Sequence, residues 1–205
     1  DTGWAKSVWG KINGQWMAGS AVFVYDMEKF IPSRLLEVMT RYRVTTFCAP
    51  PTIYRFFIKD NLSKYDFSHL KHCSIAGEPL NPEVYNQWKK ATRIELKEAY
   101  GQTELTVTVG NFPWMPVKPG SMGKPAPGYD LDLIDETGTP CSTGDEGEIV
   151  IRTDKRQPFG MFGGYYRDEK LTRHVWNNGM YHTGDVAWRD EDGYLWYVGR
   201  TDDVI

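Results

Sequence analysis

Cysteine is scarce in this chain of 205 residues, with three thiols far apart at Cys48, Cys73 and Cys141. The count is odd and no CxxC pair occurs, which argues against a zinc site and against a disulfide framework. An apolar run of about 20 residues, which a membrane-spanning helix needs, is missing as well. No sign of charge dominates, and the net charge of −3 argues against a broad nucleic-acid-binding surface. We therefore expect reduced thiols in a cytoplasmic protein without a membrane span.

Aromatic residues, in contrast, are plentiful at 14%, with 8 Trp and 12 Tyr. Part of the surface is therefore expected to suit flat ligands or another domain. The chain starts at Asp1 without a Met and ends directly after a strongly patterned segment. We expect it to be a piece of a longer protein.

The first half of the chain alternates apolar β-branched runs with helical patterns. Pro32 and Ser33 open one predicted helix, and Asn81 is a candidate cap for another over residues 82–91. The predicted buried strands cover residues 21–25, 44–48, 70–76 and 94–96. Strands that alternate with helices of this length predict βαβ units and a parallel sheet, in which ligands bind at the carboxyl ends of the strands.

The composition changes near residue 112, where five prolines fall within fifteen residues. Short strands follow, over residues 130–134, 147–152, 186–189 and 194–198. Turn sequences separate them at residues 135–138 and 190–193. This pattern predicts an all-β meander or small barrel. The predicted domains are an α/β domain over residues 1–112 and a β domain over residues 113–205.

One stretch after a predicted strand, residues 98–104 (EAYGQTE), gathers groups that suit a nucleotide. Tyr100 offers a face for a base, and Gly101 allows a sharp turn or a close approach to a ligand. Thr103 can hydrogen-bond a phosphate, and Glu104 can hold Mg²⁺. A strand-to-helix corner with ordinary polar capping explains the same residues equally well.

Two further groups in the second half have functional and structural interpretations. Asp185 follows a glycine and could accept hydrogen bonds from a sugar diol, or could satisfy the amides of a turn. Arg200 could pair with a phosphate or ribose, although a lone arginine is more often in a surface salt bridge. Asp202 and Asp203 are adjacent acids that could form a metal site, although such pairs more often cap or solvate a loop. The four histidines show no ligand spacing with the cysteines, so no metal role is expected for them.

Four motifs together resemble the adenylate-forming (AMP-binding) family, which includes acyl-CoA synthetases, peptide-synthetase adenylation domains and luciferases. They appear in the family's order over essentially the whole chain, as AGEPL at 76–80, EAYGQTE at 98–104, YHTGD at 181–185 and GRTDDVI at 199–205. The segments at 1–4, 49–55 and 158–165 look most like the medium-chain acyl-CoA synthetases. The resemblance implies part of the large N-terminal domain of such an enzyme.

The resemblance also implies roles for individual residues. Thr103 would bind the α-phosphate and the acyl carboxylate, and Glu104 would hold Mg²⁺; both are the implied catalytic residues. Trp4 would lie near the acyl pocket, and Asp202 would be the hinge of a small C-terminal domain. The implied nucleotide-binding residues are Gly77, Glu78, Pro79, Glu98, Ala99, Tyr100, Gly101, Gln102, Thr103, Asp185 and Arg200.

The activity implied is that of an ATP-dependent ligase with ATP, Mg²⁺ and coenzyme A. A carboxylic acid, fatty or aromatic, attacks the α-phosphorus of ATP, and a thiol then displaces AMP from the acyl-adenylate. The family's phosphate loop and catalytic lysine do not occur in this sequence, so the chain alone is expected to be inactive. Two alternatives stay open: an adenylation enzyme with a carrier protein as acceptor, and a non-catalytic interaction module that uses the aromatic surface.

Overall fold

The computed structural model describes residues 6–202 and divides the chain into two compact units, Asp1–Ala99 and Tyr100–Ile205. Strand β3 (Leu96–Gln102) begins in the first unit and ends in the second. This division reflects how the residues pack and does not test where folding domains begin and end. The domain boundary near residue 112 therefore stays a prediction.

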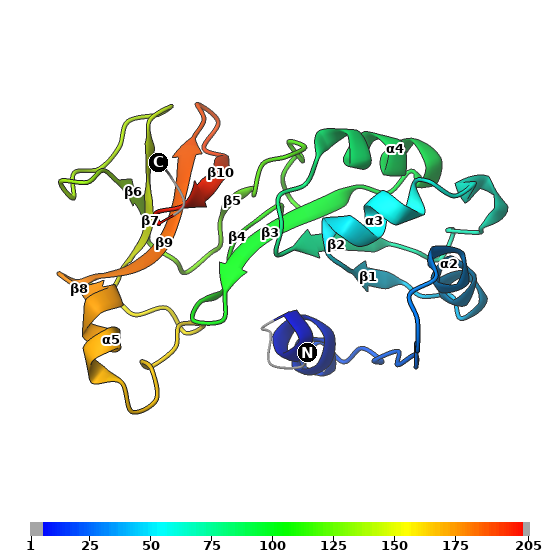
Figure 1. The fold of residues 1–205 in the computed structure, drawn as a ribbon, viewed down its shortest axis with the longest axis horizontal. Coiled ribbons are helices and arrows are strands. Elements are labelled where there is room, and N and C mark those ends of the chain that lie inside the picture. Colours follow the sequence, from blue (N-terminus) through cyan, green and yellow to red (C-terminus); the bar gives the residue numbers. More distant parts are fainter. Residues whose placement is uncertain (1–5, 203–205) are drawn as a thin grey trace. The chain divides into compact units, whose positions relative to one another are not determined.

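The first unit contains a parallel sheet, as its alternating strands and helices predict. β1 (Thr46–Cys48) pairs with β2 (His72–Ala76), and β2 pairs with β3. The register sets Ala76, the last residue of β2, opposite Ala99, and β3 continues beyond this pair to Gln102. Figure 1 shows the three strands side by side.

Helices flank this sheet, and each begins at a proline that the sequence places at its first turn. Their bounds are α2 (Pro32–Arg41), α3 (Pro51–Phe57) and α4 (Pro82–Thr92), and a short 3₁₀ turn, η2 (Leu62–Lys64), follows α3. Aromatic rings join α3 to its neighbours: Tyr54 lies 5.8 Å from the Phe47 ring of β1 and 5.0 Å from the Trp88 ring of α4. Tyr54 and Trp88 have no exposed surface, so this aromatic cluster is the core of the unit.

One predicted strand of this unit is wrong. The segment over residues 21–25 has no regular secondary structure, and it follows a π-helical turn, η1 (Lys6–Asn13), and one turn of α-helix, α1 (Gly14–Met17). Val24 is 83% exposed, and Phe23 packs its ring against Tyr42 at 5.2 Å. An apolar run becomes a strand only where another strand accepts its hydrogen bonds, and periodicity cannot supply that partner.

The second unit contains mainly antiparallel strands. β4 (Thr106–Gly110) lies between β3 and β5 (Lys124–Pro125) in the strand order, so β1 to β5 form one mixed sheet. The second sheet is antiparallel and has the order β10, β9, β7, β6, with β8 beside β9. Its strands are β6 (Leu131–Ile134), β7 (Glu146–Arg152), β8 (Trp176–Asn177), β9 (Met180–Arg189) and β10 (Leu195–Arg200). The predicted turns are confirmed: the backbone N–H of Gly138 donates to Asp135, and that of Gly193 donates to Asp190.

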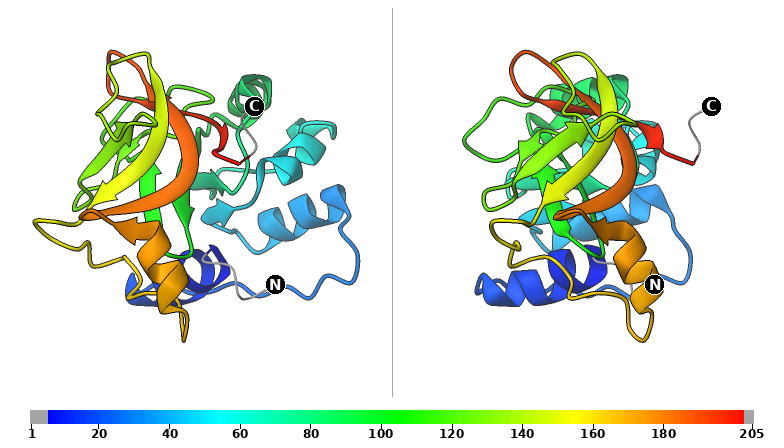
Figure 2. Two further views of the ribbon diagram at one scale, coloured as in Figure 1. Left: turned by 60° about the vertical axis from the view of Figure 1, so that its left-hand side comes forward. Right: turned by 90° about the vertical axis from the view of Figure 1, so that its left-hand side faces the viewer.

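Two expectations for this unit are corrected. The sheet is open rather than a barrel, since within residues 6–202 the edge strands β6 and β10 do not pair with each other. Register shifts between Glu148 and Val150, and between Tyr197 and Gly199, accompany the curvature of β9 in Figure 2. The unit is also not all-β, because it contains the helix α5 (Glu169–Val175).

Ordinary helix signals mark α5 in the sequence. The Asp168 carboxylate accepts the Leu171 backbone N–H at 2.9 Å as an N-cap, and Glu169 stands in the first turn. Arg173 and His174 stand in the last turn, where they complement the helix dipole. The apolar face is too short for a periodicity argument, but these capping signals predict the helix on their own.

Candidate functional site

A buried carboxylate, Asp185 of β9, lies at the centre of a hydrogen-bond network in the second unit. Its side chain is among the buried polar groups, with 5% of the residue exposed. Oδ2 accepts the Tyr100 hydroxyl at 2.6 Å and the Gln102 amide at 2.7 Å. Oδ1 accepts the Tyr197 hydroxyl at 3.3 Å and lies 3.5 Å from the Arg200 guanidinium. Residues from β3, β9 and β10 thus converge on one carboxylate, as expected for a buried acid that must be satisfied.

The side chain of Gln102 connects this carboxylate to the rest of β9. Its amide nitrogen also donates to the Thr183 carbonyl at 2.8 Å, and its amide oxygen accepts the Tyr181 hydroxyl at 3.0 Å. Both functions of the amide are therefore used, which fixes its orientation. The resemblance assigns Gln102 to the backbone wall of a nucleotide pocket, whereas here its side chain also orders Asp185.

The β9 backbone just before Asp185 is held by a second acid, Glu148 of β7. Glu148 accepts the Gly184 backbone N–H at 2.9 Å through Oε1 and lies 2.9 Å from His182 Nδ1 through Oε2. Gly184 has φ +69°, and a Cβ there would lie 2.9 Å from Arg200 Nη2. A glycine is therefore needed both for its conformation and because the guanidinium lies over it.

The first five residues of EAYGQTE, 98–102, belong to the strand, and Thr103 and Glu104 follow it. β3 begins at Leu96 and runs through Tyr100 and Gly101 to Gln102, so the strand predicted over residues 94–96 ends six residues too early. Gly101 is required by the chain itself: a Cβ at this position would lie 1.7 Å from the Thr106 carbonyl oxygen. Burial, and then the Asp185 carboxylate, raise the pKa of Tyr100 well above its ordinary value. Its hydroxyl is therefore a hydrogen-bond donor at neutral pH.

The turn between β3 and β4 carries Thr103 and Glu104. Thr103 is exposed, and Glu104 is half-buried with Oε1 accepting the Tyr165 hydroxyl at 2.9 Å. Within the part of the chain that the structure describes, no residue donates a hydrogen bond to Glu104 Oε2 or forms an ion pair with it. A carboxylate oxygen beside an accessible hydroxyl is a hard-oxygen donor set that fits Mg²⁺ when substrate phosphates complete the coordination.

The first unit holds the remaining predicted nucleotide residues. Gly77, Glu78 and Pro79 follow β2 directly and are exposed, and Ala99 stands opposite Ala76 in the parallel register. The Glu78 carboxylate accepts the Thr52 hydroxyl at 2.9 Å and pairs with Arg55 at 3.3 Å. These residues therefore leave the sheet at the carboxyl edge of β2, where the sequence predicts them.

Glu98 is a buried acid of this unit, with 5% of the residue exposed. The Leu80 backbone N–H donates to its Oε1 at 3.3 Å. Burial raises the pKa of Glu98 to about 8, and the hydrogen bond from Leu80 opposes that rise. The residue is thus a group whose protonation follows pH near neutrality.

Two predicted residues remain, Trp4 and Asp202. Trp4 is outside the described residues. Asp202 is exposed, and its carboxylate accepts Arg200 Nε at 3.3 Å. Arg200 also donates to the Thr183 carbonyl at 3.2 Å, so the guanidinium is shared between the Asp185 network and the end of the described chain.

Sequence reasoning missed three side chains that order these groups: Glu148, Tyr165 and Tyr181. Tyr181 opens the motif YHTGD, and Tyr165 ends the segment 158–165 that supports the family resemblance, so both positions stood in motifs without an assigned role. Glu148 sits in an alternating strand, where nothing in the sequence distinguishes it from a solvent-facing acid.

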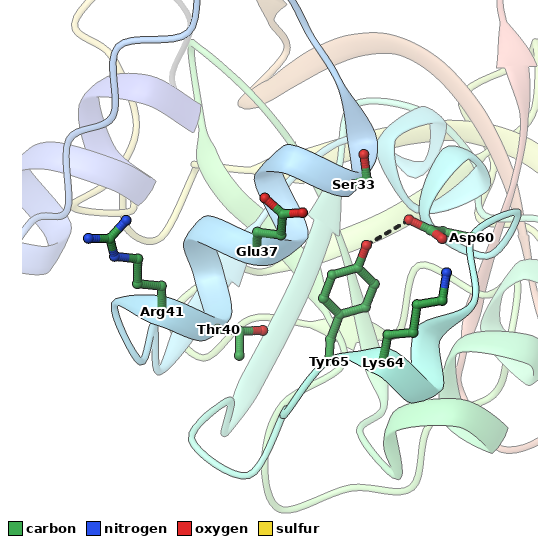
Figure 3. A pocket seen from close by; sticks show the side chains of 7 residues that line it. All are labelled: Ser33, Glu37, Thr40, Arg41, Asp60, Lys64 and Tyr65. Carbon is green, nitrogen blue, oxygen red and sulfur yellow. Dashed lines mark hydrogen bonds between the residues drawn. The ribbon is translucent and has the colours of Figure 1, made fainter.

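A hollow of about 490 Å³ lies elsewhere on the first unit (Figure 3). Residues of α2 and of the segment after α3 line it, and the Tyr65 hydroxyl donates to Asp60 at 2.8 Å across it. The lining residues are Ser33, Glu37, Thr40, Arg41, Asp60, Lys64 and Tyr65. The lining carries both signs of charge and includes none of the predicted nucleotide residues.

The fold is that of the adenylate-forming enzymes, and the chain belongs to the AMP-binding enzyme family, whose model matches residues 2–166. It is 44% identical to "Acyl-coenzyme A synthetase ACSM3, mitochondrial" of Rattus norvegicus, over all of this chain and 35% of that protein. It is likewise 44% identical to "Acyl-coenzyme A synthetase ACSM4, mitochondrial" of Homo sapiens, with the same coverage. These relatives confirm the predicted likeness to medium-chain acyl-CoA synthetases.

Solved structures agree with this membership. An acyl-CoA synthetase of Brucella canis superposes with a TM-score of 0.87 at 31% identity, over 100% of this chain and 38% of that one. The anthranilate CoA ligase AuaEII, solved with anthranoyl-AMP, gives 0.89 at 28% identity, over 98% and 38% of the two chains. ATP-bound MatB from Rhodopseudomonas palustris gives 0.87 at 26% identity, over 98% and 39%.

The relatives are longer than this chain and are named as mitochondrial. The chain spans about a third of the length of the curated relatives it matches. These relatives are named as mitochondrial, so the prediction of a cytoplasmic protein is wrong; reduced thiols are common to both compartments and could not distinguish them. Among the described residues, no helix combines the length and apolar character needed to cross a membrane.

Proposed function

We propose that this chain is part of an ATP-dependent acyl-CoA synthetase. The enzyme would activate a fatty or aromatic acid as an acyl-adenylate and transfer the acyl group to coenzyme A. The observation that carries the proposal is the buried Asp185 carboxylate, ordered by Tyr100, Gln102 and Arg200. A chain of the AMP-binding enzyme family that concentrates an aromatic ring, a carboxylate and a guanidinium in this way is suited to hold an adenosine moiety.

In the first step, a carboxylate oxygen of the acid forms a bond to the α-phosphorus of ATP, and pyrophosphate leaves. In the second, the thiol sulfur of coenzyme A forms a bond to the acyl carbon, and AMP leaves with the electron pair of the broken C–O bond. Both steps depend mainly on positioning and on charge neutralisation rather than on a protein nucleophile. The side chains are therefore expected to bind and orient the substrates.

Asp185 would accept the ribose hydroxyls, with Arg200 beside it. A carboxylate has about four lone-pair positions, and this one already faces four donors. A ribose diol would therefore replace one or more of these donors rather than add to them. Tyr100 is suited to the exchange, because releasing its hydroxyl would free its ring to lie against the adenine.

Thr103 and Glu104 would bind the phosphate end of the substrate. The exposed Thr103 hydroxyl can donate to an α-phosphate oxygen or to the acid, and Glu104 Oε2 would face the Mg²⁺ ion. Bound Mg²⁺ neutralises phosphate charge and orients the transferring group. Glu104 contributes a carboxylate whose other oxygen is already held by Tyr165, so its geometry is set before a ligand arrives.

The remaining roles follow the resemblance. Gly77, Glu78, Pro79, Glu98, Ala99, Gly101 and Gln102 would contact the nucleotide, Trp4 the acyl group, and Asp202 would act as a hinge. The names of the relatives support a mitochondrial location.

Calorimetric titration with AMP tests the nucleotide site in the protein that carries this chain. Asp185→Asn removes one charged acceptor and is expected to raise the Kd of AMP about 10- to 100-fold, as loss of charge-assisted hydrogen bonds does. Asp145→Asn, at an exposed turn of the same unit, is the matched control and should leave the Kd unchanged. Equal affinity of both variants would reject Asp185 as a nucleotide ligand.

Pyrophosphate release with a panel of carboxylic acids tests the reaction and its substrate class. Short, medium and long fatty acids and benzoate are compared with and without coenzyme A. An acyl-CoA synthetase releases pyrophosphate with at least one acid and forms the matching thioester. Nucleotide binding without pyrophosphate release for any acid would favour a binding module over an enzyme.

A further inference from the structure

Tyr165, a residue with no role in the preceding assignment, contacts the carboxylate proposed to hold the metal ion. Its hydroxyl donates to Glu104 Oε1 at 2.9 Å, although the two residues are 61 positions apart in the chain. Both side chains are half-buried, so this hydrogen bond is protected from full competition by water.

The backbone around Tyr165 is fastened to Glu104 by a second, independent contact. The Phe162 backbone N–H donates to the Glu104 carbonyl at 2.7 Å. The ring of Phe162 then packs edge-on against Tyr165 at 5.0 Å and against Tyr181 at 5.6 Å. The segment 162–165 therefore donates hydrogen bonds to both the backbone carbonyl and the side chain of Glu104.

Helix α5 and its N-cap residue hold the backbone of Tyr165. The Tyr165 backbone N–H donates to the Thr172 hydroxyl at 2.9 Å, and that hydroxyl donates to the Asp168 carbonyl at 2.8 Å. The Asp168 backbone N–H in turn donates to the Tyr165 carbonyl at 3.2 Å. Both main-chain polar groups of Tyr165 are thus tied to the capped first turn of α5, which leaves the phenol little freedom to leave Glu104.

The Tyr165 hydroxyl is the donor of this contact and the Glu104 carboxylate is the acceptor, so the contact suits the ionised form of Glu104. A donor on one oxygen of a carboxylate fixes its rotamer and directs the other oxygen, here Oε2, toward a ligand. Outer partners of this kind typically contribute 10- to 100-fold to metal affinity.

We propose that Tyr165 is a positioning residue for Glu104, which it orients for Mg²⁺ bound with the phosphates of the nucleotide. The proposal rests on the proposed function and adds to it a residue outside the resemblance-based assignment. It predicts that Tyr165 affects nucleotide binding only where the metal takes part. A residue that merely stabilised the fold would weaken all nucleotide binding alike.

The test compares Tyr165→Phe with Tyr166→Phe in the protein that carries this chain. Tyr166 is the matched control, because it is the next residue and is 85% exposed. Calorimetry measures the Kd of ATP over a series of Mg²⁺ concentrations and the Kd of AMP with a chelator. Tyr165→Phe is expected to raise the Mg²⁺ concentration needed for half-maximal ATP affinity about 10-fold and to leave the Kd of AMP within twofold. Tyr166→Phe should change neither.

A double-mutant cycle with Glu104→Gln shows whether the effect passes through Glu104. In the Glu104→Gln background, Tyr165→Phe should have no further effect on the Mg²⁺ dependence. The proposal is overturned by an unchanged Mg²⁺ dependence in Tyr165→Phe, by an equal loss of AMP and ATP binding, or by an effect that persists in the double variant. If the wild-type protein binds neither AMP nor ATP, the proposed function itself fails and the role of Tyr165 fails with it.

Discussion

At the scale of single residues, buried polar groups here are satisfied by side chains that are distant in the sequence. Tyr100 and Gln102 reach Asp185 across 85 and 83 positions, and Tyr165 reaches Glu104 across 61. Each buried polar group without a hydrogen-bond partner lowers the free energy of unfolding by roughly 1–3 kcal/mol, and a buried carboxylate lowers it by more. The motif residues are therefore held in place by partners that lie largely in the other motifs.

Gly101 gives a prediction about stability. Gly101→Ala would place a methyl group 1.7 Å from the Thr106 carbonyl oxygen, and backbone cannot yield as a flexible side chain would. We expect the free energy of unfolding to fall by about 1–3 kcal/mol, as overpacking usually costs. Urea unfolding of the protein that carries this chain measures it.

The control is Gly163→Ala, because a Cβ at Gly163 meets nothing within 4 Å. Its effect should stay within about 0.5 kcal/mol. Equal effects at the two glycines would show that the β3–β4 turn is not as tight as described.

Glu98 gives a prediction about pH. Its pKa in the folded protein is about 8, above its ordinary value of 4.5, so between these values the folded state holds a proton that the unfolded state has lost. The contribution of Glu98 to the free energy of unfolding is therefore fully present below pH 4.5. It is lost as pH rises to about 8, by at most about 1.4 kcal/mol per pH unit.

Glu98→Gln removes that titration, so urea unfolding at a series of pH values should show a shallower decline between pH 5 and 8. Glu136→Gln, at an exposed turn, should keep the wild-type slope. Parallel curves for wild type and Glu98→Gln would mean that Glu98 does not titrate in this window.

At the scale of elements, local signals explain why some segments were predicted well. Helix α4 has Asn81 as N-cap, with Oδ1 accepting the Glu83 backbone N–H at 2.8 Å, then Pro82, and Lys89 and Lys90 in its last turn. α5 carries similar signals over only seven residues, and it was not predicted. The segment 21–25 has the composition of a strand but no strand to pair with, so its composition alone misleads.

The end of α4 offers a stabilising substitution. Arg93 caps the helix with φ +67°, a left-handed conformation that costs an L-residue about 1–2 kcal/mol. Arg93→Gly should raise the free energy of unfolding by about 0.5–1 kcal/mol, because glycine adopts this conformation without Cβ strain and the relief exceeds its larger loss of conformational entropy. Arg93→Ala keeps the strained conformation and should bring no gain; a gain equal to that of glycine would point to removal of the charge as the cause.

At the scale of the whole molecule, balanced charge and family membership point the same way. A net charge of −3 suits a small nucleotide held by a few local groups better than a polyanion bound over a wide surface. The relatives are acyl-CoA synthetases, and the chain spans about a third of their length. The first compact unit has parallel strands with helices between them. The second has mainly antiparallel strands joined by turns.

Nucleotide binding should stabilise the protein that carries this chain by mass action. AMP at 100 times its Kd is expected to add about 2.7 kcal/mol to the free energy of unfolding. Chemical unfolding at increasing AMP concentration measures this, and Asp185→Asn should shift the response to higher AMP. Stabilisation that is the same in Asp185→Asn and wild type would place AMP elsewhere on the protein.

The sequence by itself determined the parallel α/β pattern, the helix starts at Pro32 and Pro82, the turns at Asp135 and Asp190, and the family. These depend on residues close together in the chain, so local propensity and motif order were enough. Only the tertiary structure decided that the antiparallel sheet stays open, that residues 21–25 form no strand, and that Gln102 and Tyr165 order the two acids. Strand partners and side-chain hydrogen bonds across 60 or more positions depend on where the folded chain returns, which no local pattern specifies.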